Sequence, residues 1–199
     1  MLKLTSIISG GQTGADRGGL DAAIHLGLIF GGACPEGRRA EDGAIPEKYN
    51  TLTALPGSSY EPRTRKNVRD ADATIIFNLG KSISGGSHLT RKCAETEGRP
   101  CLVVRICRIE TGYEEFVEPV AQWLMAVNPA VLNVAGNRES IAPGVQEYVA
   151  KLLVGSIARA RVMEAMPIES RPATLSTTID GKGFSAQRGA SKPVQMGLF

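Results

Sequence analysis

The stretch Ser9-Gly-Gly-Gln-Thr-Gly-Ala-Asp-Arg-Gly-Gly-Leu20 decides the fold of this chain. It joins an apolar run at residues 4–9, expected to be a buried strand, to a segment at residues 18–26 expected to be a helix. Glycines allow a tight turn and bring N–H groups close to a ligand, and the start of a helix favours an oxyanion such as phosphate. The turn has neither the Gly-Lys-Ser/Thr of a Walker loop nor the G-x-G-x-x-G dinucleotide fingerprint. We therefore predict an anion-binding turn, with a purely structural turn and helix cap as the alternative.

The same order of apolar run, turn and amphipathic stretch repeats along the chain. We expect further strands at residues 51–55, 73–78, 101–106 and 130–134, and helices at residues 62–71, 86–97, 113–127 and 143–161. Nearly continuous apolar strands that alternate with helices are typical of a parallel sheet covered on both faces. The pattern predicts an α/β fold, a Rossmann-like, doubly wound, mostly parallel sheet with helices on both faces, in residues 1–161. Residues 162–199 show no sustained period and are predicted to be a flexible C-terminal tail.

The composition narrows the classes of function. A chain of 199 residues suits one domain, and a net charge of +3 suits an anionic ligand without the clustered charge of a nucleic-acid-binding protein. No apolar run approaches the roughly 18 residues of a membrane span, and the N-terminus has no cleavable signal pattern. The 4 cysteines form no Cys-x-x-Cys pair and the chain has 2 histidines, so we predict no protein-bound metal. A reducing cytoplasm is the expected compartment.

Two further glycine-rich turns follow predicted strands. Ser84-Gly-Gly-Ser-His-Leu-Thr90 comes after the strand at 73–78, and Ala135-Gly-Asn-Arg-Glu-Ser-Ile-Ala-Pro-Gly144 comes after the strand at 130–134. In a doubly wound sheet, turns that follow parallel strands meet in one crevice at the carboxyl edge. We therefore predict that the three turns form one binding site, although the second turn alone could equally be a mobile surface loop.

Charged side chains near these turns complete the predicted site. Arg63-Thr-Arg-Lys-Asn-Val68 places cations at a helix start, against the helix dipole, which indicates a bound anion. The polar loop at residues 34–43 adds further charge. The candidate ligand-binding residues are Gly10, Gly11, Thr13, Gly14, Asp16, Arg17, Arg38, Arg63, Thr64, Asn67, Gly85, Gly86, Ser87, Gly136, Arg138, Glu139 and Ser140. No catalytic residue is assigned.

Taken together, these motifs resemble the molybdenum carrier family. The runs SGGQTGADRGGLDAAIHLGL, GGACPEGRRAEDGAIPEKY, RTRKNVRDADATIIF and LNVAGNRES occur in this order within residues 4–155. The resemblance implies a circularly permuted branch of the SLOG-type Rossmann proteins, often oligomeric, with members proposed to hold molybdenum cofactor, a pterin that carries a phosphate. Other SLOG proteins are phosphoribohydrolases with a Pro-Gly-Gly-x-Gly-Thr-x-x-Glu turn. Its nearest match here, residues 84–90, lacks the second Gly-Thr pair and the glutamate.

Three functions follow as hypotheses. The first is a cytoplasmic, homo-oligomeric binding protein for a phosphorylated nucleotide-like or pterin ligand, with molybdenum cofactor or a nucleotide as candidates. The second is a SLOG-type nucleotide-processing hydrolase or transferase, with Asp16, Glu139 or Glu41 as general acid or base. The third is a DNA-transaction accessory protein, because Gln195-Met-Gly-Leu-Phe199 resembles the peptide that docks on the bacterial sliding clamp. There Gln195 would bind the pocket rim and Leu198 and Phe199 would fill the pocket, unless the terminus folds back on its own domain.

Overall fold

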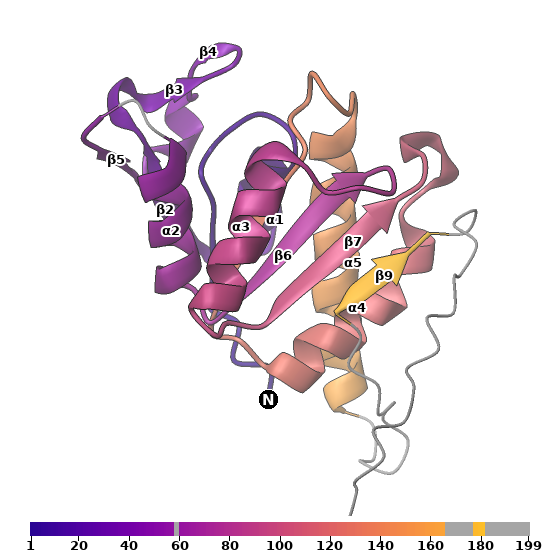
Figure 1. The fold of residues 1–199 in the computed structure, drawn as a ribbon. Coiled ribbons are helices and arrows are strands. Elements are labelled where there is room, and N and C mark those ends of the chain that lie inside the picture. Colours follow the sequence, from indigo (N-terminus) through magenta and orange to yellow (C-terminus); the bar gives the residue numbers. More distant parts are fainter. Residues whose placement is uncertain (58–59, 166–176, 182–199) are drawn as a thin grey trace, which may run out of the picture.

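A seven-stranded parallel sheet forms the centre of the protein (Figure 1). The computed structural model describes residues 1–57, 60–165 and 177–181. The strands lie in the order β5-β2-β1-β8-β6-β7-β9, and each neighbouring pair is parallel. This confirms the predicted α/β fold. The bounds are β1 (Ser6–Ile8), β2 (Ile29–Pro35), β5 (Leu52–Leu55), β6 (Ala73–Leu79), β7 (Cys101–Ile106), β8 (Val131–Gly136) and β9 (Thr178–Asp180).

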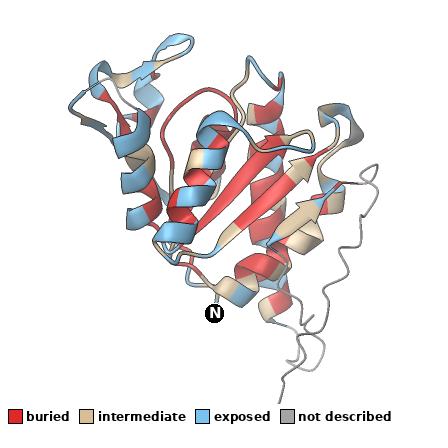
Figure 2. Cartoon of the chain, viewed as in Figure 1, coloured by how far each residue is buried: buried red, intermediate tan, exposed pale blue. Residues whose placement is uncertain are grey.

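Helices cover both faces of the sheet. Helices α1, α4 and α5 pack together on one face, while α2 and α3 pack together on the other (Figure 1). The central strands β6 and β7 are largely buried between these layers, and the outer faces of the helices are exposed (Figure 2). The bounds are α1 (Ala15–His25), α2 (Tyr60–Asp70), α3 (Gly85–Thr96), α4 (Glu114–Val127) and α5 (Val145–Glu164).

Strand β2 is an element that the sequence did not indicate, because glycines interrupt its apolar pattern. Gly32 has a φ of +123°, and a Cβ there would lie 2.2 Å from the Ser9 carbonyl oxygen. The glycine therefore lets β2 approach the end of β1 closely. After β2 the chain forms a small hairpin of β3 (Arg39–Ala40) and β4 (Gly43–Ala44). The short 3-10 helices η1 (Glu36–Arg38) and η2 (Glu47–Tyr49) flank this hairpin, and η3 (Ile109–Thr111) follows β7.

Helix α1 starts at Ala15, earlier than the predicted residue 18, so two glycines lie inside the helix. A Cβ on Gly18 would lie 2.6 Å from the Gln146 carbonyl oxygen, and a Cβ on Gly19 would lie 2.6 Å from Val134. These glycines let α1 pack tightly against α5 and β8, which outweighs their low helix propensity.

The C-terminal boundary also differs from the predicted one. Helix α5 continues to Glu164, and residues 178–180, within the segment expected to be a tail, form β9 beside β7. The proposed clamp-binding residues Gln195, Leu198 and Phe199 lie outside the described residues.

The position of β8 creates the crevice expected at the carboxyl edge of the sheet. The chain moves from β1 outward to β2 and β5, and then from β6 outward to β7. Strand β8, which follows all of these in sequence, lies between β1 and β6. The loops after β1, β6 and β8 therefore emerge side by side at the point where ligands bind in such sheets.

Candidate functional site

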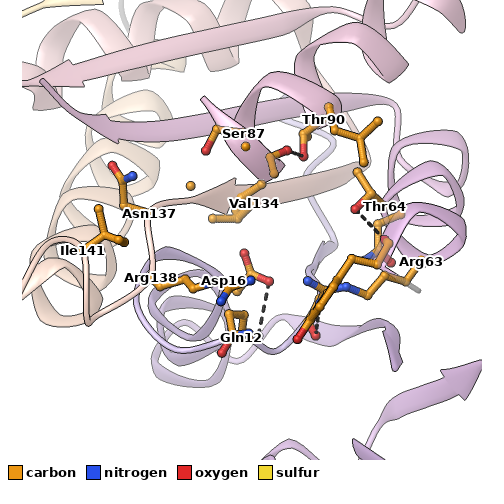
Figure 3. A pocket seen from close by; sticks show the side chains of 18 of the residues that line it. Gln12, Asp16, Arg63, Thr64, Ser87, Thr90, Val134, Asn137, Arg138 and Ile141 are labelled. Atoms are coloured by element: carbon orange, nitrogen blue, oxygen red, sulfur yellow. Dashed lines mark hydrogen bonds between the residues drawn. The ribbon is translucent and has the colours of Figure 1, made fainter. Parts of the chain in front are cut away.

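A cavity of about 490 Å³ opens at this edge of the sheet (Figure 3). Its volume falls within the range of small-molecule sites. Residues of all three glycine-rich turns and of the start of α2 line it. The predicted residues that line the cavity are Gly10, Asp16, Arg63, Thr64, Asn67, Gly85, Gly86, Ser87, Gly136, Arg138 and Ser140.

The N-terminus of α3 forms one wall of the cavity. The first N–H groups of a helix have no partner within the helix, and the side chain of the capping residue Ser84 does not bond to them. A Cβ on Gly85 or Gly86 would meet no atom within 4 Å, so this turn is open. The wall therefore offers N–H donors and a partial positive charge to a ligand.

Two arginines add full positive charge. Arg63 donates from Nη1 to the Gly10 carbonyl oxygen at 3.0 Å, while its buried Nε has no hydrogen-bond partner among the described residues. Within the described part of the chain, neither Arg63 nor Arg138 forms an ion pair. Their Cζ atoms lie 4.6 and 5.5 Å from the centre of the Tyr60 ring, so one aromatic ring holds both guanidinium groups. Sequence reasoning missed Tyr60, although an aromatic residue just before a cationic helix start could have signalled it.

Asp16 brings a carboxylate into the same cavity, where its side chain points toward Val134 (Figure 3). Burial raises the pKa of Asp16, while the Arg63 guanidinium and the backbone N–H groups of Gln12 and Gly10 act in the opposite direction. The Gln12 N–H donates to Asp16 Oδ2 at 3.3 Å. A carboxyl group in this setting can accept hydrogen bonds from a ligand or exchange a proton with it.

Gln12 is a second residue that sequence reasoning missed. Its Oε1 accepts the backbone N–H of Thr13 at 3.0 Å and of Glu41 at 2.9 Å. Gln12 lines the cavity, and its Nε2 is buried without a hydrogen-bond partner among the described residues. The only signal in the sequence was a polar side chain between the glycines of the first turn.

Two of the predicted cations lie outside the cavity lining and have internal partners. Arg17 forms a two-pronged ion pair with Asp42 at 2.6 and 2.8 Å and donates from Nε to the Gly11 carbonyl oxygen. Arg38 donates to the backbone carbonyl oxygens of Leu52 and Tyr49 at 3.3 and 3.1 Å. Both guanidinium groups therefore hold the loop at residues 34–43 in place.

Gly14, Thr13 and Glu139 form a junction between the first and third turns, while Gly11 packs against β5. A Cβ on Gly14 would lie 2.4 Å from the Asn137 carbonyl oxygen, so the two backbones touch there. A Cβ on Gly11 would lie 2.6 Å from the Leu52 side chain. Thr13 Oγ1 donates to Glu41 and accepts the N–H of Glu139, whose carboxylate in turn accepts N–H groups at the start of α5. The glycines and the Thr13 hydroxyl therefore serve packing within the protein.

Glu41 joins this junction from the β3–β4 hairpin. It accepts the Ser140 N–H at 3.2 Å and the Ser140 hydroxyl at 2.6 Å. These bonds and that from Thr13 outweigh partial burial and lower the pKa of Glu41. Neither Glu41 nor Glu139 lines the cavity, which leaves Asp16 as the one predicted acid or base that does.

Two residues of α2 line the cavity but are already bonded within the protein. Asn67 donates to and accepts from the backbone of Ala33 at 3.1 and 2.7 Å, which ties α2 to β2. The Thr64 hydroxyl donates to the Tyr60 carbonyl oxygen at 3.0 Å. Asn67 therefore positions Arg63 and Tyr60 through the helix they share.

In the part of the chain that the structure describes, no three His, Cys, Asp or Glu side chains gather into a metal site. No helix among residues 1–57, 60–165 and 177–181 is both long and apolar enough to cross a membrane.

Comparisons with known proteins agree with this architecture. The model of the "Circularly permutated YpsA SLOG family" matches residues 7–157. The chain is also similar to a crystal structure named "Putative molybdenum carrier protein" from Syntrophus aciditrophicus SB. The two share 41% sequence identity with a TM-score of 0.70, over 78% of this chain and 96% of that one. No curated protein matches the sequence.

The strand order explains the permutation. If β8 and α5 came before β1, the strands would leave the centre of the sheet in two simple outward runs, β8-β1-β2-β5 and β6-β7. Two outward runs from the centre are also the pattern of the usual doubly wound sheet. The resemblance noted from the sequence motifs is thus confirmed, and the chain belongs to the circularly permutated YpsA branch of the SLOG family.

Proposed function

We propose that this protein binds a phosphate-bearing heterocycle, a nucleotide or a pterin such as molybdenum cofactor, in the cavity at the carboxyl edge of the sheet. One observation carries the proposal: Arg63, Arg138 and the open N-terminus of α3 line one cavity, and neither arginine has an ion-pair partner among the described residues. Unpaired cations beside free N–H groups suit a phosphate group. The name of the similar Syntrophus protein supports molybdenum cofactor as the cargo.

Calorimetry with nucleoside monophosphates and a pterin phosphate tests the proposal. A charge-assisted hydrogen bond contributes about 1.5–3 kcal/mol, so Arg138→Ala should weaken binding roughly ten- to a hundredfold. Arg91→Ala is the matched control, because Arg91 is an exposed residue of α3 paired with Glu95. Equal affinity in the wild type and in Arg138→Ala would remove Arg138 from the site. Native mass spectrometry of protein purified from its own host would identify a bound cargo.

A second candidate function is nucleotide hydrolysis or group transfer. Asp16 favours it, since its pKa is raised in the cavity and a general acid must hold its proton near the working pH. Incubation with nucleoside monophosphates, followed by chromatography for the released base, measures this activity. Release by the wild type that is lost in Asp16→Asn would establish an enzyme, while stable nucleotide in both would leave the binding function.

A further inference from the structure

Asn137, a residue of the third turn that was not among the predicted binding residues, is held in place by three hydrogen bonds. Its backbone N–H donates to the Phe77 carbonyl oxygen at 3.0 Å, and its own carbonyl oxygen accepts the Ala15 N–H at 3.0 Å. Its side-chain Oδ1 accepts the Leu79 N–H at 2.5 Å. These bonds join the end of β8 to β6 and to the start of α1. They therefore fix the Asn137 side chain with respect to the cavity that the residue lines.

The same bonds leave the amide nitrogen of Asn137 free. Because Oδ1 accepts the Leu79 N–H, the reversed amide would set two donors against each other, so Nδ2 is the other end. Nδ2 forms no hydrogen bond within the described part of the chain, and Asn137 is only partly buried. In Figure 3 this nitrogen lies on the side of the amide that faces Ser87 and the cavity. Asn137 therefore offers a fixed, neutral donor to a ligand.

Ser87, in the first turn of α3, offers a second free group. Its side chain is almost completely buried, with the residue 6% exposed, yet its hydroxyl has no hydrogen-bond partner among residues 1–57, 60–165 and 177–181. A buried polar group without a partner is unfavourable, so a ligand that supplies one gains affinity. Figure 3 shows the Ser87 hydroxyl and the Asn137 amide at the same end of the cavity. Two side chains from different elements thus meet at the open N-terminus of α3.

A phosphate group matches this set of donors. Its terminal oxygens accept hydrogen bonds, while the Asn137 amide nitrogen and the first N–H groups of α3 can only donate and the Ser87 hydroxyl can donate as well. The N-terminus of α3 adds partial positive charge, which favours an anion over a neutral acceptor.

We infer that Asn137 Nδ2 and the Ser87 hydroxyl bind oxygens of the ligand's phosphate group at the N-terminus of α3. This inference rests on the proposed function, that the cavity binds a phosphate-bearing heterocycle, and it assigns the phosphate to one end of the cavity. Asn137 then has two separate roles: Oδ1 holds the turn in place, and Nδ2 binds the ligand.

Two substitutions separate these roles. Asn137→Asp keeps an oxygen for the Leu79 N–H and the shape of the side chain, but it replaces the donor with a charged acceptor. Its urea denaturation midpoint should therefore equal that of the wild type, while its affinity should fall roughly a hundredfold. Ser87→Ala removes a hydroxyl that has no internal partner, so the midpoint should not fall and the affinity should drop at least about fivefold.

Calorimetry on the full chain with adenosine and inosine monophosphates measures these affinities. The two nucleotides share ribose and phosphate and differ in the ring, so a lost phosphate contact should weaken both by the same factor. Ile141→Asp is the control for charge, because Ile141 lines the cavity but is 63% exposed, and it should cost less than about threefold. Thr96→Ala, which removes an exposed hydroxyl from the other end of α3, should leave both affinities unchanged.

The outcomes separate the two proposals. Wild-type affinity in Ser87→Ala, or a loss in Asn137→Asp no larger than that in Ile141→Asp, would overturn the inference, and a loss confined to one nucleotide would do so too. If Arg138→Ala still weakened binding, the proposed function would stand. Should Asn137→Asp fail to fold by circular dichroism, Ser87→Ala alone must weaken both nucleotides equally. No binding of either nucleotide or of a pterin phosphate to the wild type would refute the proposed function and this inference together.

Discussion

Two glycine-rich turns border the same cavity, yet their glycines have opposite surroundings. In the turn between β1 and α1, a Cβ on Gly10, Gly11 or Gly14 would lie 2.3, 2.6 or 2.4 Å from another atom. In the turn before α3, a Cβ on Gly85 or Gly86 would meet nothing within 4 Å. Glycine in the first turn allows close packing of backbone and side chains, whereas in the second it leaves a helix N-terminus open. Similar sequences therefore perform different physical tasks.

The difference arises from neighbours that are distant in sequence. The first turn touches the loop after β8, the β3–β4 hairpin and the start of α2 through Gly14, Thr13 and Gly10. The turn before α3 has no such neighbours at its glycines. The first turn is closely packed and holds Asp16 and Gln12, whereas the turn before α3 is open to an anion. Such a pair suits a site that binds the two ends of a ligand differently.

The largest expected effect concerns crowding in the first turn. Gly14→Ala places a Cβ at a φ of +77° and against the Asn137 carbonyl oxygen, so the free energy of unfolding should fall by about 3 kcal/mol. Urea denaturation measures this loss. Gly98→Ala is the control, because Gly98 also has a positive φ of +62° but no atom within 4 Å of the added Cβ. It should lose only about 1 kcal/mol, the cost of backbone strain. Equal losses would show that crowding is unimportant.

The next prediction tests whether Arg17, the cation of the first turn, has a structural role. Arg17→Met removes a guanidinium group whose side chain is 6% exposed, and leaves Asp42 and the Gly11 carbonyl oxygen without it. We expect the free energy of unfolding to fall by about 2 kcal/mol, since Asp42 itself is accessible to water. The affinity for inosine monophosphate should stay within about twofold. A tenfold loss of affinity in a stable variant would place Arg17 in the binding site.

A smaller effect concerns the carboxylate that the first turn holds. Burial raises the pKa of Asp16 in the folded protein, so folding favours the protonated group, and its ionisation lowers stability as the pH rises through that pKa. Asp16→Asn should therefore raise Tm at pH 7 by roughly 2–4 °C. The difference should vanish below about pH 3.5, where the carboxyl is protonated in both states. A lower Tm for Asp16→Asn at neutral pH would contradict this account.

The smallest effect on stability is expected in the open turn. Gly86→Ala adds a methyl group to α3 without any contact, so the free energy of unfolding should change by less than about 1 kcal/mol and should increase. The same urea experiment measures it beside Gly14→Ala. If Gly86→Ala proved as destabilising as Gly14→Ala, the difference between the two turns would not hold.

Much of the fold could be predicted, because local patterns carry it. The apolar, β-branched run at residues 73–78 and the run at 101–106 correspond closely to β6 and β7. Strand β2 could not be predicted, since two glycines interrupt its apolar pattern, and Gly32 serves close approach to the Ser9 backbone and not strand propensity. The start of α1 was placed too late for a similar reason, because Gly18 and Gly19 pack against other elements from within the helix.

The sequence predicted which turns form the candidate site, but it did not predict which side chains within them face the cavity. Arg17 and Arg63 look alike in sequence, yet Asp42 neutralises Arg17 while Arg63 lies on the Tyr60 ring beside the cavity. Gln12 escaped notice because it is an uncharged residue among the glycines of the first turn, and Tyr60 because it lies just before the cationic run. The Arg17–Asp42 and Gln12–Glu41 contacts join residues 25 and 29 positions apart, and local patterns do not encode such contacts.

The sequence by itself determined the α/β class and the meeting of three glycine-rich turns at one edge of the sheet. Parallel strands joined by helices all end at the same edge, so turns that follow such strands lie along that edge, and the position of β8 between β1 and β6 brings these three side by side. Only the tertiary structure decided which polar groups remain free to bind. A guanidinium or carboxylate can serve a ligand only if no internal partner has already satisfied it. Internal contacts satisfy Arg17, Arg38 and Glu139, whereas Arg63, Arg138, Gln12 and Asp16 line the cavity.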